Sequence, residues 1–194
     1  SAMYNTTGRG FRGFASITEI DNTDSTMVTR TETDYLQKFP HSSLAWKQAS
    51  YQGAETNTVP FSLLTNSWLE NSNYIGVGYH LYNALSTKVT CALGAFACGN
   101  IEIDANGKIE INGSYLTKET TTVGSGGIDG SGNITSSTTI VSDDNATYNT
   151  ITSAEFPVPE NHLPTQKVVT SSEVSYGNNS NISIAAGTNV SKTV

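Results

Sequence analysis

Three histidines are the side chains best suited to acid–base chemistry in this chain. A catalytic triad needs a nucleophile, a histidine and an acid that converge with hydrogen-bonding geometry. His41, His80 and His162 stand far apart in the sequence, and none lies in a Gly-x-Ser-x-Gly nucleophile setting. We interpret them as surface or turn residues and expect the chain not to be an enzyme.

A second arrangement with catalytic potential consists of carboxylates. Glu102, Asp104 and Glu110 lie among the isoleucines of residues 101–111. Paired carboxylates hydrolyse glycosides only across a cleft, with one acid of raised pKa. On the outer face of a strand such acids are solvated, so we expect no catalysis from them.

Two Asp-containing turns resemble the beginning of calcium-binding loops. Asp104 with Asn106, and Asp129 with Asn133, supply the oxygen ligands that Ca²⁺ prefers. Neither stretch has the bidentate acid that completes an EF-hand loop. We favour the alternative, a turn in which Asp accepts hydrogen bonds from its own backbone, and expect no bound metal or cofactor.

Aromatic residues offer a binding hypothesis. Trp68, Tyr74, Tyr79 and Tyr82 could form a sugar-stacking platform in an adhesin. Aromatic rings on strands also pack across strands in a core. Both interpretations are open on the sequence alone.

Composition indicates a hydroxyl-rich β protein. The shares of hydrophobic residues (36%) and charged residues (14%) are low, and Thr, Ser, Asn and Gly make up the difference. Thr and Tyr favour strands, whereas Asn and Gly favour turns. A net charge of −7 with ten scattered Lys and Arg excludes a phosphate-tracking surface for nucleic acid. No apolar run approaches the about 20 residues that span a bilayer.

Residue periodicity predicts antiparallel hairpins with little or no helix. The clearest hairpin is residues 101–111, in which isoleucines occupy one face and acids the other around a turn at 104–107. Another joins residues 14–20 to the Thr-rich run 27–35. Further strands are expected at 115–123, 133–141, 147–156 and 167–176. Only 43–52 and 61–71 could hold a helical turn.

Cys91 and Cys98 are the two cysteines of the chain. A two-residue turn at Gly94 and Ala95 would place them opposite each other, within the Cα separation that a disulfide tolerates. Two buried free thiols are the alternative. Two cysteines with no nearby histidine cannot complete a tetrahedral zinc site.

The most specific motif lies near the N-terminus. Residues 8–14 read Gly-Arg-Gly-Phe-Arg-Gly-Phe, and a Thr-rich arm at 29–33 and a Tyr…Phe-Pro segment at 35–40 follow. This order resembles Rhs and YD-repeat proteins, SpvB-like proteins and the B component of Tc insecticidal toxins (the TcdB middle region). The signature residues are Gly8, Arg9, Gly10, Phe11, Gly13, Phe14, Phe39 and Pro40.

Weaker likenesses continue along the chain. Residues 65–68 resemble the family's Thr-Asn-Thr-Trp, and residues 128–134 resemble one YD repeat, with Ile128 in place of its Tyr. Pro164 and Thr165 replace the Leu-Gly that normally ends the unit. The resemblance covers most of residues 8–176.

The resemblance implies a domain organisation. Residues 1–3 resemble a remnant of recombinant expression, so we expect an excised fragment whose native N-terminus is missing. Residues 4–176 would form the β domain, with a hairpin unit at about 8–60, a variable part at about 61–100 and a hairpin and YD-like unit at about 101–176. Residues 177–194 would be a polar C-terminal segment with frayed final residues.

The resemblance also implies a function. The chain would be a non-catalytic architectural segment of a large exported bacterial toxin, within a curved, repeat-like β-shell that encloses or delivers a C-terminal toxin. Its partners would be the remainder of the parent chain and, in the Tc type, a pore-forming subunit, in a secreted or extracellular setting. The alternative is an extracellular adhesin or carbohydrate-binding β domain.

Overall fold

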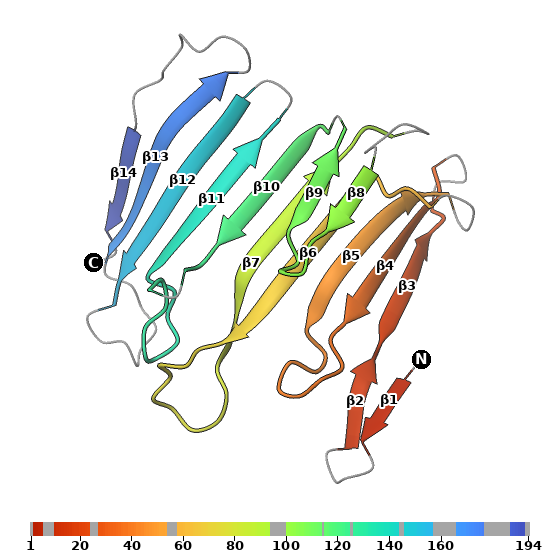
Figure 1. Cartoon of the computed structure of the whole chain (residues 1–194), viewed down its shortest axis with the longest axis horizontal. Coiled ribbons are helices and arrows are strands. Elements are labelled where there is room, and N and C mark those ends of the chain that lie inside the picture. The colour runs from red at the N-terminus through yellow and green to blue at the C-terminus, as the bar shows by residue number, and fades with distance from the viewer. Residues whose placement is uncertain are drawn as a thin grey trace. The chain divides into compact units, whose positions relative to one another are not determined.

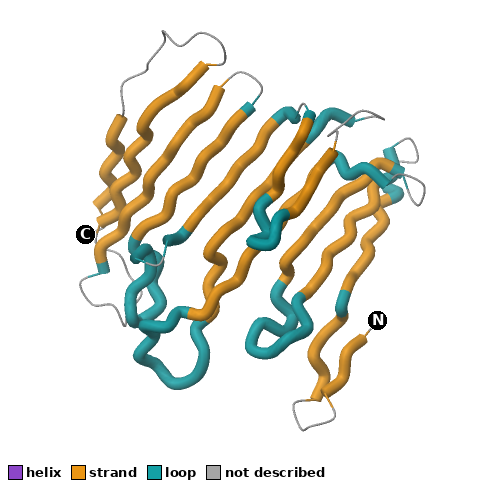
Figure 2. Tube along the Cα trace, viewed as in Figure 1, coloured by secondary structure: helices purple, strands orange, loops and turns teal. Residues whose placement is uncertain are grey.

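The structure is a computed structural model of the whole chain. It describes residues 2–5, 10–23, 27–53, 58–93, 100–113, 115–124, 126–143, 146–156, 166–176 and 187–192. Those residues form strands, turns and loops and contain no helix (Figure 2). The prediction of an all-β fold is confirmed.

The strands form one large antiparallel sheet and two short ribbons. β1 pairs with β2, and β8 pairs with β9. In the large sheet the hydrogen-bonded order is β14-β13-β12-β11-β10-β7-β6-β5-β4-β3 (Figure 1). The strands are β1 (Ala2–Asn5), β2 (Gly10–Phe14), β3 (Ser16–Asp21), β4 (Thr29–Tyr35), β5 (Ala45–Gln52), β6 (Ser62–Glu70), β7 (Leu81–Thr90), β8 (Asn100–Ile103), β9 (Ile109–Asn112), β10 (Thr117–Thr122), β11 (Ser136–Ser142), β12 (Ala146–Glu155), β13 (Gln166–Tyr176) and β14 (Gly187–Lys192).

The chain divides into two compact units. The first contains Ser1–Trp68 and Thr87–Thr117, and the second contains Leu69–Ser86 and Lys118–Val194. The first unit therefore contains the β8–β9 hairpin together with strands, such as β5, that come much earlier in the sequence.

The predicted hairpins are confirmed where alternation was clearest. In β8–β9, Ile101 pairs with Ile111 and Ile103 with Ile109. The Thr-rich run forms β4 and pairs with β3. β11 and β12 overlap the strands expected at 133–141 and 147–156, and they pair with each other.

The two stretches that could have held a helical turn, 43–52 and 61–71, contain strands instead. In β5, Ala49 and Tyr51 are buried on alternate positions, and in β6 Leu63 and Thr65 are buried in the same way. This period of two is the signature of a strand with one covered face.

Strands also occupy two regions that the sequence left without one. β7 lies inside the predicted variable part and buries Thr87 and Val89. β14 lies in the C-terminal segment and pairs with β13. The final residues, 193–194, lie outside the described residues.

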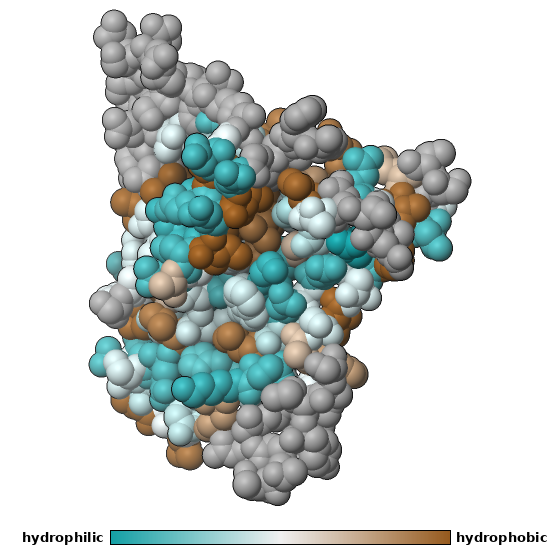
Figure 3. Space-filling model, turned by 45° about the vertical axis from the view of Figure 1, so that its right-hand side comes forward, coloured by the Kyte–Doolittle hydropathy of each residue, from teal (hydrophilic) through white to brown (hydrophobic). Residues whose placement is uncertain are grey.

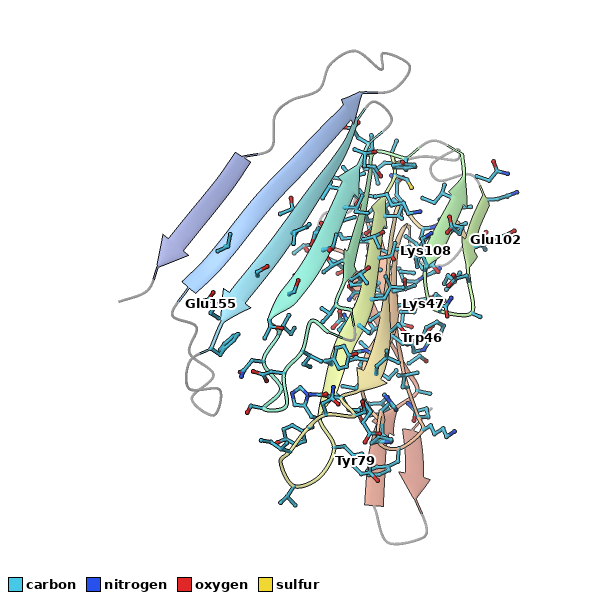
Figure 4. All side chains as sticks on the ribbon, turned by 60° about the vertical axis from the view of Figure 1, so that its left-hand side comes forward. Trp46, Lys47, Tyr79, Glu102, Lys108 and Glu155 are labelled. Carbon is cyan, nitrogen blue, oxygen red and sulfur yellow. The ribbon has the colours of Figure 1, made fainter. Side chains whose placement is uncertain are left out.

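The core of the first unit lies between the sheet and the β8–β9 hairpin. Figures 1 and 4 show the hairpin against one face of β5 and β6. Burial of one apolar face is what stabilises an otherwise marginal two-stranded hairpin. The buried cluster consists of Ala49, Tyr51, Leu63, Val89, Cys91 and Ile109, with Ile101, Ile103, Ile111 and Tyr115 packed against it.

Apolar side chains also remain on the surface. Figure 3 shows hydrophobic residues interspersed among hydrophilic ones on the face in view. Ile20 on β3 is half exposed, which makes it a suitable reference for the core.

Ile109 is fully buried, and we expect Ile109→Ala to lower the free energy of unfolding by about 2–5 kcal/mol because it leaves a cavity under the hairpin. Ile20→Ala, in the same unit, should cost less than about 1 kcal/mol. Urea denaturation measures both. Equal losses in the two variants would contradict this account of the core.

Candidate functional site

One feature able to hold a small molecule in the first unit is a pocket at the turn of the β8–β9 hairpin. Its volume is about 260 Å³. Apolar and polar side chains both line it, and they come from the loop after β4, from β5, from β6, from the end of β8 and from the hairpin turn. The lining residues are Leu36, Trp46, Asn66, Ser67, Trp68, Ile103, Asp104, Ala105, Asn106 and Gly107.

The indole of Trp68 is held in place by the neighbouring strand. Its Nε1 donates a hydrogen bond to the carbonyl oxygen of Ala45 at 2.8 Å. The amide nitrogen of Asn66 donates to the same oxygen at 3.3 Å. These bonds join β6 to the start of β5 beside Trp46, and Figure 4 shows Trp46 on the side of the sheet that carries the hairpin.

The opposite wall is a turn closed by Asp104. Its Oδ1 accepts hydrogen bonds from the backbone N–H of Asn106 at 2.9 Å and of Lys108 at 2.8 Å. The Gly107 N–H donates to the Asp104 carbonyl, and Gly107 has a φ of +84°. This is a type I turn followed by a left-handed residue, a common hairpin connection. The Lys108 amide is the main reason that the pKa of Asp104 lies below its ordinary value.

Thr65 ties this turn to the sheet. Thr65 on β6 is fully buried, and its hydroxyl donates a hydrogen bond to the carbonyl oxygen of Gly107. The hairpin is therefore held at its tip by a polar contact as well as along its apolar face.

The second unit contains the same turn. Asp129 Oδ1 accepts from the N–H of Ser131 at 2.9 Å and of Asn133 at 2.8 Å, and Gly132 has a φ of +92°. Its Oδ2 accepts from the side-chain amide of Asn133 at 2.8 Å. Burial raises the pKa of Asp129, but hydrogen bonds from Asn133, Ser131 and Gly132 outweigh this effect and leave the pKa below its ordinary value.

A long loop from the β6–β7 connection packs on the Asp129 turn. The Asn71 side chain, which is buried, donates to the carbonyl oxygen of Asp129 at 2.8 Å. The ring of His80 lies so close to Gly132 that a Cβ there would clash with it. The rings of Tyr74 and His80 are 5.0 Å apart between centroids.

The four calcium candidates thus belong to two self-capped turns. Asp104 and Asp129 each accept hydrogen bonds from backbone N–H groups of their own loop. Among the described residues, no three His, Cys, Asp or Glu side chains gather in a way that could hold a metal ion.

The two ends of the N-terminal signature meet in space. Gly13 has a φ of +91°, and a Cβ on it would lie 2.6 Å from the hydroxyl of Ser43. The side-chain amide of Gln37 donates to the carbonyl oxygens of Phe14 at 2.9 Å and Tyr35 at 3.1 Å. The loop that carries Phe39 and Pro40 is thereby fixed beside the end of β2.

Other signature residues are only partly described. Gly10 and Phe11 lie in β2. Gly8 and Arg9 lie outside the described residues.

The carboxylates and histidines considered for catalysis lie at several places in the structure. Glu102 and Glu110 are opposite each other on the exposed face of the hairpin, and Glu110 forms an ion pair with Lys108 at 2.6 Å. His41 and His80 lie in different units. His162 is outside the described residues.

The four aromatic residues considered as a sugar-stacking platform belong to both units. Trp68 lines the pocket of the first unit, whereas Tyr74, Tyr79 and Tyr82 belong to the second. Trp46 was missed, because nothing in the sequence signals that β5 pairs with β6.

Cys91 is buried in the core and is disulfide-bonded. Cys98 is the other cysteine of the chain and lies outside the described residues, as does the predicted turn at Gly94 and Ala95.

The chain matches no protein-family model, no curated protein and no solved structure. In the described part of the chain, no helix is long and apolar enough to cross a membrane.

The lowered pKa of Asp129 gives a testable pH dependence. Unfolding restores an ordinary pKa of about 3.9, so the stabilisation is complete above about pH 4 and is lost as the pH falls through the folded-state pKa. Asp129→Asn should therefore lower the free energy of unfolding more at about pH 7 than at about pH 2.5. Glu155→Gln, on the exposed end of β12, is the matched control and should show no such difference. An equal loss at both pH values would refute this role for Asp129.

A second prediction concerns the disulfide. We expect Cys91 to pair with Cys98 within one chain, so that thiol titration of the denatured, unreduced protein finds no free thiol. Reduction should lower the free energy of unfolding by about 2–4 kcal/mol. A disulfide-linked dimer on non-reducing electrophoresis would contradict the intrachain pairing.

Proposed function

We propose that the chain is a non-catalytic architectural segment of a large exported bacterial toxin of the Rhs/Tc type. In this proposal the chain forms part of the wall of a curved, repeat-like β-shell, and the shell encloses or delivers a C-terminal toxin. The observation that carries the proposal is the contact between the first and last parts of the family-like signature, through the hydrogen bond from Gln37 to Phe14.

The sheet edge formed by β3 supports this proposal. All six residues of β3 are exposed, and among the described strands β3 pairs in the sheet with β4 alone. Ile17 and Ile20 on this strand are large apolar side chains with little cover. An unprotected edge of this kind suits pairing with a neighbouring hairpin of a longer chain.

The repeated turn supports it as well. The Asp104 and Asp129 loops share the Asp-x-x-Gly spacing and the same hydrogen bonds, although they lie in different units. A wall built from successive hairpins needs such a local, self-sufficient connection. The disulfide at Cys91 fits an oxidising, extracellular setting.

The test uses the complete parent chain from its reading frame. If the proposal holds, cryo-electron microscopy should place this segment in a closed β wall whose next strand pairs with β3. A C-terminal domain should resist protease in the intact shell and become sensitive after mild denaturation. A parent chain with a cell-wall anchor, no further Rhs or YD repeats and no enclosed domain would refute it.

The second candidate is an extracellular adhesin or carbohydrate-binding β domain. The pocket that contains Trp46 and Trp68 favours it, because two indoles in one lining, with polar side chains beside them, suit recognition of a small polar ring.

A further inference from the structure

We infer that the pocket between Trp46, Trp68 and the Asp104 turn binds one neutral pyranose ring of a glycan. The inference rests on the second candidate function, carbohydrate binding, and names the site and the ligand class. It does not depend on whether the parent chain forms a shell.

The size of the pocket suits a single sugar ring. Its volume of about 260 Å³ is slightly below the about 300–1,000 Å³ of typical small-molecule sites. A proline-rich peptide docks instead along an extended aromatic groove. The pocket is closed at one end by the hairpin turn, where Ala105 and Gly107 line it.

The lining provides the two kinds of contact that a pyranose needs. The face of an indole carries partial negative charge, which attracts the electropositive C–H groups on one side of a sugar ring. Hydroxyl groups need donors and acceptors, and Asn106 and Asp104 supply an amide and a carboxylate on the opposite wall.

Asp104 keeps acceptor capacity despite its role in the turn. A carboxylate has about four lone-pair sites. The N–H groups of Asn106 and Lys108 use two of them. Asp104 is also the one charged residue among the lining residues, so anionic sugars and phosphates are disfavoured and a neutral ring is preferred.

The walls are fixed before any ligand arrives. Trp68 is held by its hydrogen bond to Ala45, and the turn is held by its internal bonds and by Thr65. A site that needs little ordering loses little of its binding free energy to entropy.

Intrinsic tryptophan fluorescence can report on ligand binding in this pocket, because both tryptophans of the chain line it. The 194-residue chain is titrated with the methyl pyranosides of glucose, galactose, mannose and N-acetylglucosamine, each to about 50 mM, well above a millimolar dissociation constant. We expect a saturable change in tryptophan emission with at least one of them.

Variants then locate the site. Trp46→Ala should weaken binding by about tenfold or more, and Asn106→Ala by a smaller factor, with Trp68 still reporting. Tyr79→Ala, which removes an exposed aromatic ring of the second unit, is the control and should bind as the unaltered chain does. If Trp46→Ala fails to fold by circular dichroism, the exposed turn residue Asn106 carries the test.

Three results would overturn the inference: no response to any of the four glycosides, equal affinity in the Trp46 or Asn106 variant and the Tyr79 control, or binding of a proline-rich peptide in place of the sugars. None of these bears on the architectural proposal. Conversely, a parent chain without a shell would leave the titration result unchanged.

Discussion

The hydrogen bond from Thr65 to the Gly107 carbonyl is the contact on which the organisation of the first unit depends. A two-stranded hairpin is marginal by itself, because half of its side chains face water. Held at its tip by this bond and along its length by its isoleucines, the β8–β9 hairpin becomes the second layer of a core. The same bond places the turn where it forms a wall of the pocket. The bond from Thr65 to Gly107 therefore contributes both to the stability of the first unit and to the shape of the candidate site.

The turn is stabilised by hydrogen bonds within its own loop, and it occurs twice in the described part of the chain. Asp104 and Asp129 each organise a loop through one carboxylate oxygen and a following glycine of positive φ. What differs is the partner outside the loop: the Asp104 turn meets a strand through Thr65, whereas the Asp129 turn meets a loop through Asn71. The residues of the loop thus determine the shape of the turn, whereas residues distant in the sequence determine which element the turn contacts.

This distinction explains how far the sequence could predict the structure. The β8–β9 hairpin was predictable because its alternation and its turn residues are adjacent in the chain. β5 and β6 were not, since their buried positions include Ala49 and Thr65, which no hydropathy pattern distinguishes from surface residues. The pocket could not be foreseen either, because its residues come from separate strands and a turn whose register only long-range pairing fixes. Asp104 was expected to cap a turn, but nothing local indicated the side chains it would face.

The distance along the chain between the hairpin and its platform has a consequence during synthesis. Thr65 and Gly107 are separated by 42 residues. A ribosome adds about 5–20 residues per second. About 2–8 s therefore pass between the synthesis of Thr65 on β6 and that of Gly107 in the hairpin that covers β5 and β6. The hairpin then closes on itself within about 1–10 μs. For those seconds the apolar face around Ala49 and Leu63 is open to any other nascent chain, and that interval is when this protein is most vulnerable to misassembly.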